Sequence, residues 1–148
     1  MKTSSLYNTD YSEWIQETLK EIKAKNFAKV DWSNLIEEIE SMGKSERRAL
    51  LSLLTRLLEH LLKMFYWDAE KERNYNHWAS EVVNFRAQIE NQLEDSPSLK
   101  RELPAFYQRA HSTAIKSVSK LFALPNDASI SLENALDDDW FPEEKGKR

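Results

Sequence analysis

Apolar side chains recur at helical spacing along most of the chain, with polar side chains between them. Residues 10–25 form the first such segment, with Asp10 as an N-terminal cap and Glu13 three residues later. Residues 32–42 form the second, with Asp31 as its cap and Gly43 where a helix often ends. The apolar stripes consist of Tyr11, Trp14, Ile15, Leu19 and Ile22 in the first segment and of Trp32, Leu35, Ile36, Ile39 and Met42 in the second. We therefore predict two amphipathic helices whose stripes pack in the core.

The third segment, residues 45–65, is apolar over about half of its helical circumference. Its apolar residues are Leu50, Leu51, Leu53, Leu54, Leu57, Leu58, Leu61, Leu62, Met64 and Phe65. A helix on the surface of a globular protein usually carries a narrower stripe. We therefore predict that this Leu-rich helix is central and contacts neighbours on at least two sides.

Two more main helices and a short last one complete the prediction. Residues 67–76 are polar and indicate a loop or a frayed helix end, and residues 76–93 form the fourth helix. The fifth helix begins at Ser96 and Pro97 and extends to about residue 122, and Pro104 predicts a kink or a short break near Leu103. Residues 132–137 suit a short helix and residues 140–148 an extended tail. The sequence thus predicts an all-α fold, a single domain over residues 1–148 with about five main helices bundled around the third.

Composition narrows the classes of function. Two Gly are too few for a G-x-G-x-x-G dinucleotide loop or a G-x-x-x-x-G-K-S/T phosphate loop. The absence of Cys excludes disulfides, thiolate metal sites and thiol nucleophiles, and it suits a reducing compartment. The first residues lack the apolar segment of a signal peptide, and no apolar run reaches the ~20 residues of a membrane span. We expect a cytoplasmic protein that does not insert into membranes.

The charge pattern argues against a nucleic-acid partner. The formal net charge is −4. Residues 1–43 carry five basic and eight acidic side chains, and residues 94–125 carry five basic and three acidic ones. No segment is strongly basic, whereas nucleic-acid-binding domains carry a basic patch or stripe.

One stretch of the chain matches a known pattern. Residues 31–63 resemble the signature of the bacterial DUF29 family, which is D-x-x-x-L-x-E-E-I-E-x-M-G followed by an Arg-bearing helix that ends in H-L-L-K. Further matches are Trp78, Arg86, D-S-P-S-L at 95–99, Pro104 and A-L-D-D-D-W-F-P at 135–142. The resemblance implies an all-helical bacterial protein. It implies no activity, because the family is defined as one of unknown function.

Polar side chains near the apolar stripes form a candidate cluster, which consists of Glu38, Glu40, Arg47, His60 and Arg86. We expect His60 to hydrogen-bond with a carboxylate, and the hypothesised partner is Glu38 or Glu40. Arg47 is expected to pair with Glu40 across the turn at Gly43. Structural ion pairs and hydrogen bonds are the favoured interpretation of the cluster. Ligand binding or acid–base chemistry is the alternative.

Two other features bear on sites. Neither Glu-x-x-His nor His-x-x-x-His occurs in the sequence, so we expect no metal site and no cofactor. Trp140 and Phe141 follow three Asp residues and precede Pro142. They either anchor the tail on the bundle, which we favour, or stay exposed as an interaction motif.

The wide apolar arc of the third helix favours a helical protein-interaction or regulatory module without catalytic activity. Its partner would be another protein or a second copy of the chain. The alternative is a small-ligand-binding protein or an enzyme, with a pocket at the junction of the second, third and fourth helices. That pocket would be lined by Glu38, Glu40, Arg47, His60 and Arg86, and these side chains would need to converge.

Overall fold

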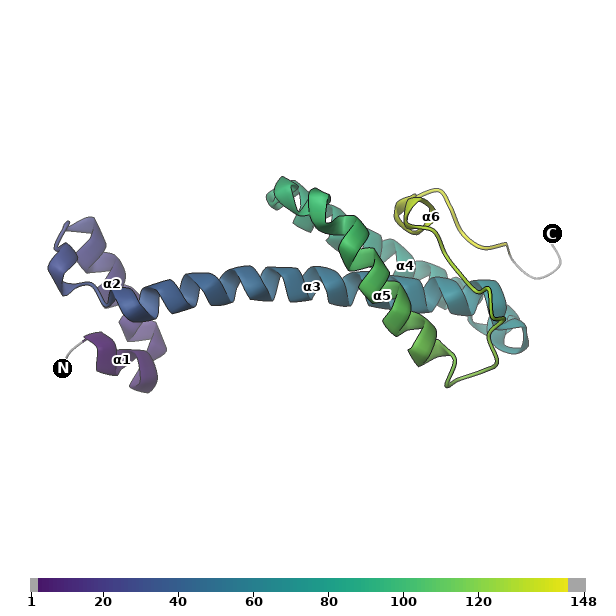
Figure 1. Ribbon diagram of the computed structural model, residues 1–148, viewed down its shortest axis with the longest axis horizontal. Helices are drawn as coiled ribbons and strands as arrows, with labels where there is room; N and C mark the ends of the chain where they lie inside the picture. Colours follow the sequence, from purple (N-terminus) through teal and green to yellow (C-terminus); the bar gives the residue numbers. More distant parts are fainter. Residues whose placement is uncertain (1–2, 144–148) are drawn as a thin grey trace. The chain divides into compact units, whose positions relative to one another are not determined.

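All regular elements of the described chain are helices (Figure 1). The computed structural model describes residues 3–143, and no strand occurs among them. The elements are α1 (Thr3–Thr9), α2 (Tyr11–Lys23), the 3-10 helix η1 (Phe27–Lys29), α3 (Trp32–Tyr66), α4 (Asp68–Asp95), the 3-10 helix η2 (Pro97–Glu102), α5 (Leu103–Val118) and α6 (Leu132–Leu136). The predicted all-α fold class is confirmed.

The chain divides into two compact units, unit 1 with residues 1–46 and unit 2 with residues 47–148. The boundary falls inside α3. The expectation of one domain over residues 1–148 stays a prediction. Among residues 3–143, no helix combines the length and the apolar character that crossing a membrane requires.

Side-chain caps fix the helix starts of unit 1. The carboxylate of Asp10 accepts a hydrogen bond from the Glu13 backbone N–H at 3.0 Å, which confirms the predicted cap of α2. Asp31 caps α3 by accepting from the Asn34 backbone N–H at 3.4 Å. The same carboxylate accepts from the indole Nε1 of Trp14 at 3.1 Å. Trp14 is buried, so this bond ties α2 to the start of α3.

A single helix, α3, replaces the second and third predicted helices. The predicted helix end at Gly43 is wrong, because α3 continues through it from Trp32 to Tyr66. One glycine inside a helix costs only about 1 kcal/mol, and the neighbouring Met42, Lys44 and Glu46 are good helix formers. A glycine alone therefore does not end this helix.

The core of unit 2 is built on the second half of α3. Seven of its side chains are 0% exposed: Leu50, Leu54, Leu57, Leu58, Leu61, Leu62 and Met64. They pack against buried residues of α4 and α5, such as Val82, Ile89, Ala110 and Ala114. Trp67 alone connects α3 to α4, so α4 returns along α3 (Figure 1). The prediction of a central Leu-rich helix is confirmed.

The predicted loop at residues 67–76 is wrong, because α4 begins at Asp68. Asp68 and Glu70 lie in its first turn, where negative charge favours a helix. Glu70 also forms an ion pair with Arg73 at 3.2 Å, at the i,i+3 spacing that stabilises helices. Lys71, which looks like a surface residue in the sequence, is 1% exposed.

The remaining boundaries agree well with the predictions. The break near Leu103 is confirmed, since η2 ends at Glu102 and Pro104 lies in the first turn of α5. The helix α5 ends at Val118, earlier than expected, and α6 lies where the short last helix was predicted. Residues 140–143 of the predicted extended tail lie outside any helix, and residues 144–148 lie outside the described part of the chain.

Candidate functional site

Glu38 of the candidate cluster is engaged within unit 1. Its carboxylate accepts hydrogen bonds from the hydroxyls of Tyr7 and Tyr11, each at 2.9 Å. The bond to the negative carboxylate raises the pKa of Tyr7 to about 12 and also raises the pKa of Tyr11. Glu38 thus ties α1 and α2 to α3. Glu40 is exposed.

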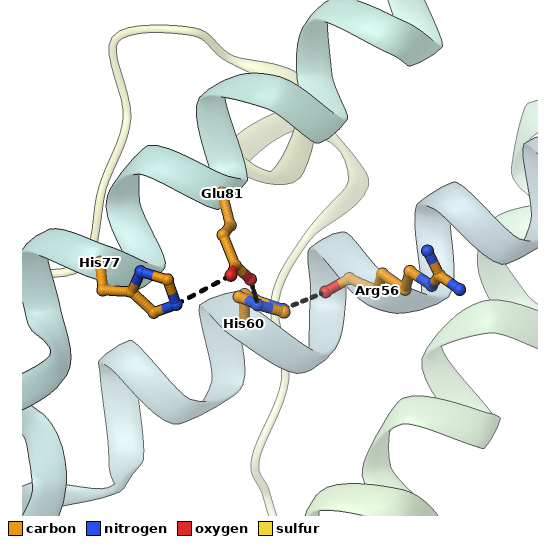
Figure 2. A network of polar contacts seen from close by, with 4 residues as sticks. All are labelled: Arg56, His60, His77 and Glu81. Atoms are coloured by element: carbon orange, nitrogen blue, oxygen red, sulfur yellow. Dashed lines mark hydrogen bonds and ion pairs between the residues drawn. The ribbon is translucent and has the colours of Figure 1, made fainter.

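His60 pairs with a carboxylate, as expected, but with Glu81 of α4 rather than with Glu38 or Glu40 (Figure 2). Its Nδ1 donates to the carbonyl oxygen of Arg56 at 2.8 Å, one turn earlier in α3. Its Nε2 contacts one oxygen of Glu81, and Nε2 of His77 contacts the other oxygen at 2.9 Å. Glu81 therefore lies between two imidazoles (Figure 2).

This network joins α3 to α4. Both ring nitrogens of His60 face oxygen atoms, the Arg56 carbonyl and the Glu81 carboxylate. Neither ring nitrogen of His60 is without a partner in this arrangement. Among the described residues, no three His, Asp or Glu side chains are grouped so that they could hold a metal ion.

Arg47 forms a surface ion pair. Its Nε lies 3.3 Å from the Glu102 carboxylate at the end of η2, so the predicted pairing with Glu40 is wrong. The two side chains are 52% and 40% exposed. Exposed pairs of this kind contribute about 1 kcal/mol or less to stability.

Arg86 is buried and binds main-chain carbonyls instead of a carboxylate. Its Nε donates to Ala135 at 2.8 Å, and its Nη2 donates to Asn134 at 3.1 Å and to Trp140 at 2.8 Å. The first two carbonyls lie at the C-terminal end of α6, where a cation is favourable. Burial lowers the pKa of Arg86, and the nearby Asp138 and Asp137 oppose this effect.

Trp140 and Phe141 are partly buried against the core of unit 2, as the anchor interpretation expects. The guanidinium of Arg86 lies over the Phe141 ring, 4.9 Å from its centroid. The segment 129–142 is also bonded to Tyr66, Tyr75 and His111. Arg86 and the aromatic pair therefore fasten this C-terminal segment onto unit 2.

Within unit 2 the structure does not bring Arg47, His60 and Arg86 together. Their partners are Glu102, Glu81 and three carbonyls near α6, respectively. A pocket of about 300 Å³ lies beside Arg86, but it has charges of both signs, from Lys100 and Arg86 and from Glu90, Glu94 and Asp138. Among the described residues of this unit, the three side chains therefore have separate partners and form no common cluster.

Most of the exposed large hydrophobic side chains of the described chain lie on unit 1. Eight of the ten large hydrophobic side chains that are exposed among the described residues belong to it: Tyr11, Ile15, Leu19, Phe27, Trp32, Ile36, Ile39 and Met42. We call these eight side chains the open face. Their exposed fractions range from 41% for Ile15 to 65% for Met42. Isolated exposed hydrophobics are common, but a contiguous group of this size marks an interaction surface.

A groove runs through the open face between α2 and the first turns of α3. It has a volume of about 280 Å³ and is almost entirely apolar. Tyr11, Ile15 and Leu19 line it from α2, and Ile39 and Met42 line it from α3. Groove and face together give unit 1 an exposed apolar surface.

The sequence predictions missed this surface, because the same residues formed the apolar stripes expected in the core. Trp14 and Thr18 of α2 are buried, but Trp32, Ile36 and Ile39 of α3 are about half exposed. The missing information was the number of neighbours, since a stripe looks identical whether or not another helix covers it. In contrast, the Leu-rich arc that motivated the interaction hypothesis packs within the core of unit 2.

No curated protein and no solved structure matches the chain. The helix from Asp31 onward, the break before Leu103 and the anchored Trp140 and Phe141 all lie within a region that matches one family model. That model describes the domain of unknown function DUF29 and matches residues 6–141. The chain therefore belongs to the DUF29 family.

Proposed function

We propose that this chain is a helical protein-interaction module without catalytic activity, and that the open face of unit 1 is its binding surface. The observation that carries the proposal is the clustering of eight large exposed hydrophobics on residues 11–42. Interfaces are built around such apolar surfaces, with aromatic residues and Met enriched at their centres. Tyr11, Trp32 and Met42 supply these residue types here.

The surroundings of the open face support the same function. Charged side chains border its stripes on the two helices, with Lys23 on α2 and Glu40 on α3. An apolar centre with a polar rim is the usual anatomy of a protein–protein interface. The groove adds a recess in which a side chain of the partner can lodge.

The alternative, a ligand-binding protein or an enzyme that uses the Glu/Arg/His cluster, has less support. His60, Arg47 and Arg86 each have a partner of their own within unit 2, and Glu38 is engaged by two tyrosines in unit 1. A catalytic site needs its acid, base and substrate-binding groups to converge on one place.

We propose further that the protein acts in a bacterial cytoplasm. A chain without Cys suits a reducing compartment, and the DUF29 pattern resembles that of bacterial proteins. Fractionation of the native host, followed by detection with an antibody against the chain, should find it with the cytoplasmic markers. Recovery with membrane or periplasmic markers would contradict this assignment.

Site-specific photocrosslinking tests the binding surface. A photoreactive amino acid placed at Met42, which is 65% exposed, should give covalent adducts with a protein when the native host is irradiated. The matched control is Val83 of unit 2, which is 56% exposed but does not belong to the open face. Equal adduct yields at the two positions, or none at Met42, would contradict the proposal.

A further inference from the structure

We infer that the occupant of the open face is a second copy of this chain, and that the two copies pair with their α2 helices antiparallel. This inference rests on the proposed function and names its partner. It follows from the area of the open face, from the number of helices in unit 1 and from the charges along α2.

The area agrees with what a stable dimer needs. The eight side chains of the open face are 41–65% exposed. With roughly 150–200 Å² for the full area of one such side chain, they present on the order of 700 Å² per copy. Each partner in a standard-size interface contributes about 800 Å². A second copy would cover an equal area with the same residue types.

The number of helices in unit 1 also favours a second copy. Helices need a second layer on which to bury their apolar stripes, and unit 1 offers only α2 and the first turns of α3 beside the short α1. A two-fold axis supplies that layer from an identical surface, because an isologous interface uses the same patch on both partners. Two copies of unit 1 would then bury their stripes in a helical bundle.

The charges along α2 select an antiparallel arrangement. Asp10 caps α2, and its first half carries Glu13 and Glu17. Its second half carries Lys20 and Lys23, with Glu21 as the exception, and Lys25 follows two residues after its end. Most of these charges lie on the side of α2 away from Tyr11, Ile15 and Leu19, so they act on the partner helix at longer range rather than through contacts. Their effect is attractive in an antiparallel pair, where the acidic half of one helix lies nearest the basic half of the other. The opposed helix dipoles favour the same arrangement. A parallel pair would place like charges side by side.

Sedimentation equilibrium on the purified full chain is the first test. The wild type should have twice the mass of one chain at micromolar concentration. Ile39→Glu buries a charge in the proposed interface and should weaken the dimer on the order of 100-fold. Val83→Glu places the same charge on an equally exposed residue outside the open face and should leave the dimer unchanged.

A charge-exchange experiment identifies the partner and the orientation. One variant carries Lys20→Glu and Lys23→Glu, so that α2 is acidic throughout. The other carries Glu13→Lys and Glu17→Lys, so that its charges are mainly basic. Each variant alone should dimerise more weakly than the wild type, because the antiparallel pair now places like charges nearest each other. An equimolar mixture should restore a dimer that contains one copy of each variant.

The outcomes separate this inference from the proposed function. A monomeric wild type at high concentration overturns self-association. If the crosslinks from Met42 then contain a different protein, the interaction module is retained with another partner. If Met42 gives no adduct either, both proposals fail. A dimer that Ile39→Glu and Val83→Glu weaken equally would place the interface elsewhere and overturn the inference. Circular dichroism of each variant shows whether its helices are retained.

Discussion

Units 1 and 2 have similar apolar stripes in sequence but bury them to different extents. In unit 2 the side chains of Leu54, Leu58 and Leu61 are 0% exposed, because α4 and α5 pack around α3. In unit 1 the stripe of the same helix α3 is open, with Ile36 at 55% and Ile39 at 59%. One continuous helix thus has a closed apolar face in its second half and an open one in its first. The difference shows that burial depends on the number of neighbouring helices rather than on the stripe itself.

The largest effect should come from a cavity in the closed core. Leu58→Ala should lower the free energy of unfolding by about 2–5 kcal/mol, because the lost side chain leaves a cavity that the core fills only partly. Ile39→Ala, in the open face, should cost less than about 1 kcal/mol in the monomer. Urea denaturation of both variants, at concentrations too low for self-association, measures the two values. Equal losses would mean that the open face is covered within the monomer.

A smaller loss of stability is expected when the hydrogen bonds between Arg86 and the C-terminal segment are removed. Arg86→Met removes three hydrogen bonds and leaves the carbonyls of Asn134, Ala135 and Trp140 without this donor, which should cost about 2–3 kcal/mol. Amide exchange should accelerate in residues 130–142. Arg47→Met is the matched control, and removing its exposed ion pair should cost about 1 kcal/mol or less. If Arg86→Met left the free energy of unfolding unchanged, the packing of the C-terminal segment would not depend on the guanidinium.

Acidification should destabilise unit 2 through His111. Its Nε2 accepts a hydrogen bond from the Ile130 backbone N–H at 3.3 Å, which requires the unprotonated nitrogen, and burial lowers its pKa. The unfolded chain then binds the proton more tightly than the folded one. Stability is therefore complete above the unfolded pKa of about 6.5 and falls as the pH decreases toward the lower folded pKa.

Thermal unfolding of the wild type and of His111→Gln, at pH values of about 7.5 and 5.5, measures this contribution. Glutamine keeps an acceptor but does not titrate. The melting temperature should decrease by a few degrees more in the wild type than in the variant. An identical decrease in both would show that His111 does not contribute.

The smallest effect concerns the tyrosines of unit 1. Glu38→Gln removes the negative acceptor that raises the pKa of Tyr7 to about 12, so this pKa should move back toward its ordinary value of about 10. Since the folded pKa is raised, the stabilisation by this bond is complete below about pH 10 and is lost as the pH rises through about 12. Near-ultraviolet absorbance of the phenolate follows the titration. If the pKa of Tyr7 were the same in the variant, the hydrogen bond from Tyr7 to Glu38 would not be the cause of the raised pKa.

Most of the fold could be predicted from local signals. The caps at Asp10 and Asp31 and the proline near Leu103 mark chain positions where a single residue decides the hydrogen bonding of a helix end. The helix end predicted at Gly43 was wrong because the free-energy cost of one glycine inside a helix is small, and the residues around it have high helix propensity. The loop predicted at the polar start of α4 was wrong because an ion pair and acidic residues in the first turn stabilise a helix there, although it has few apolar residues.

The polar contacts were less predictable, because they depend on which helices become neighbours. That His60 would pair with a carboxylate followed from its position at the edge of a stripe. That the carboxylate is Glu81 depends on α4 returning along α3, which no local pattern encodes. Arg86 was expected in an ion pair, but its partners are two carbonyls of α6 and the carbonyl of Trp140, 48 to 54 residues later in the chain. The open face was missed for the same reason.

The packing of the C-terminal segment on unit 2 affects folding during synthesis and the stability of truncated chains. Ile130, Ala135 and Pro142 are buried, and their segment leaves the ribosome after all the helices of the core. A nascent chain that lacks this segment leaves Arg86 without its carbonyl partners, so we expect unit 2 to close only after synthesis has passed Pro142. A fragment that ends before residue 130 should therefore be prone to aggregation. The shortest fragment of unit 2 that folds should extend through Pro142.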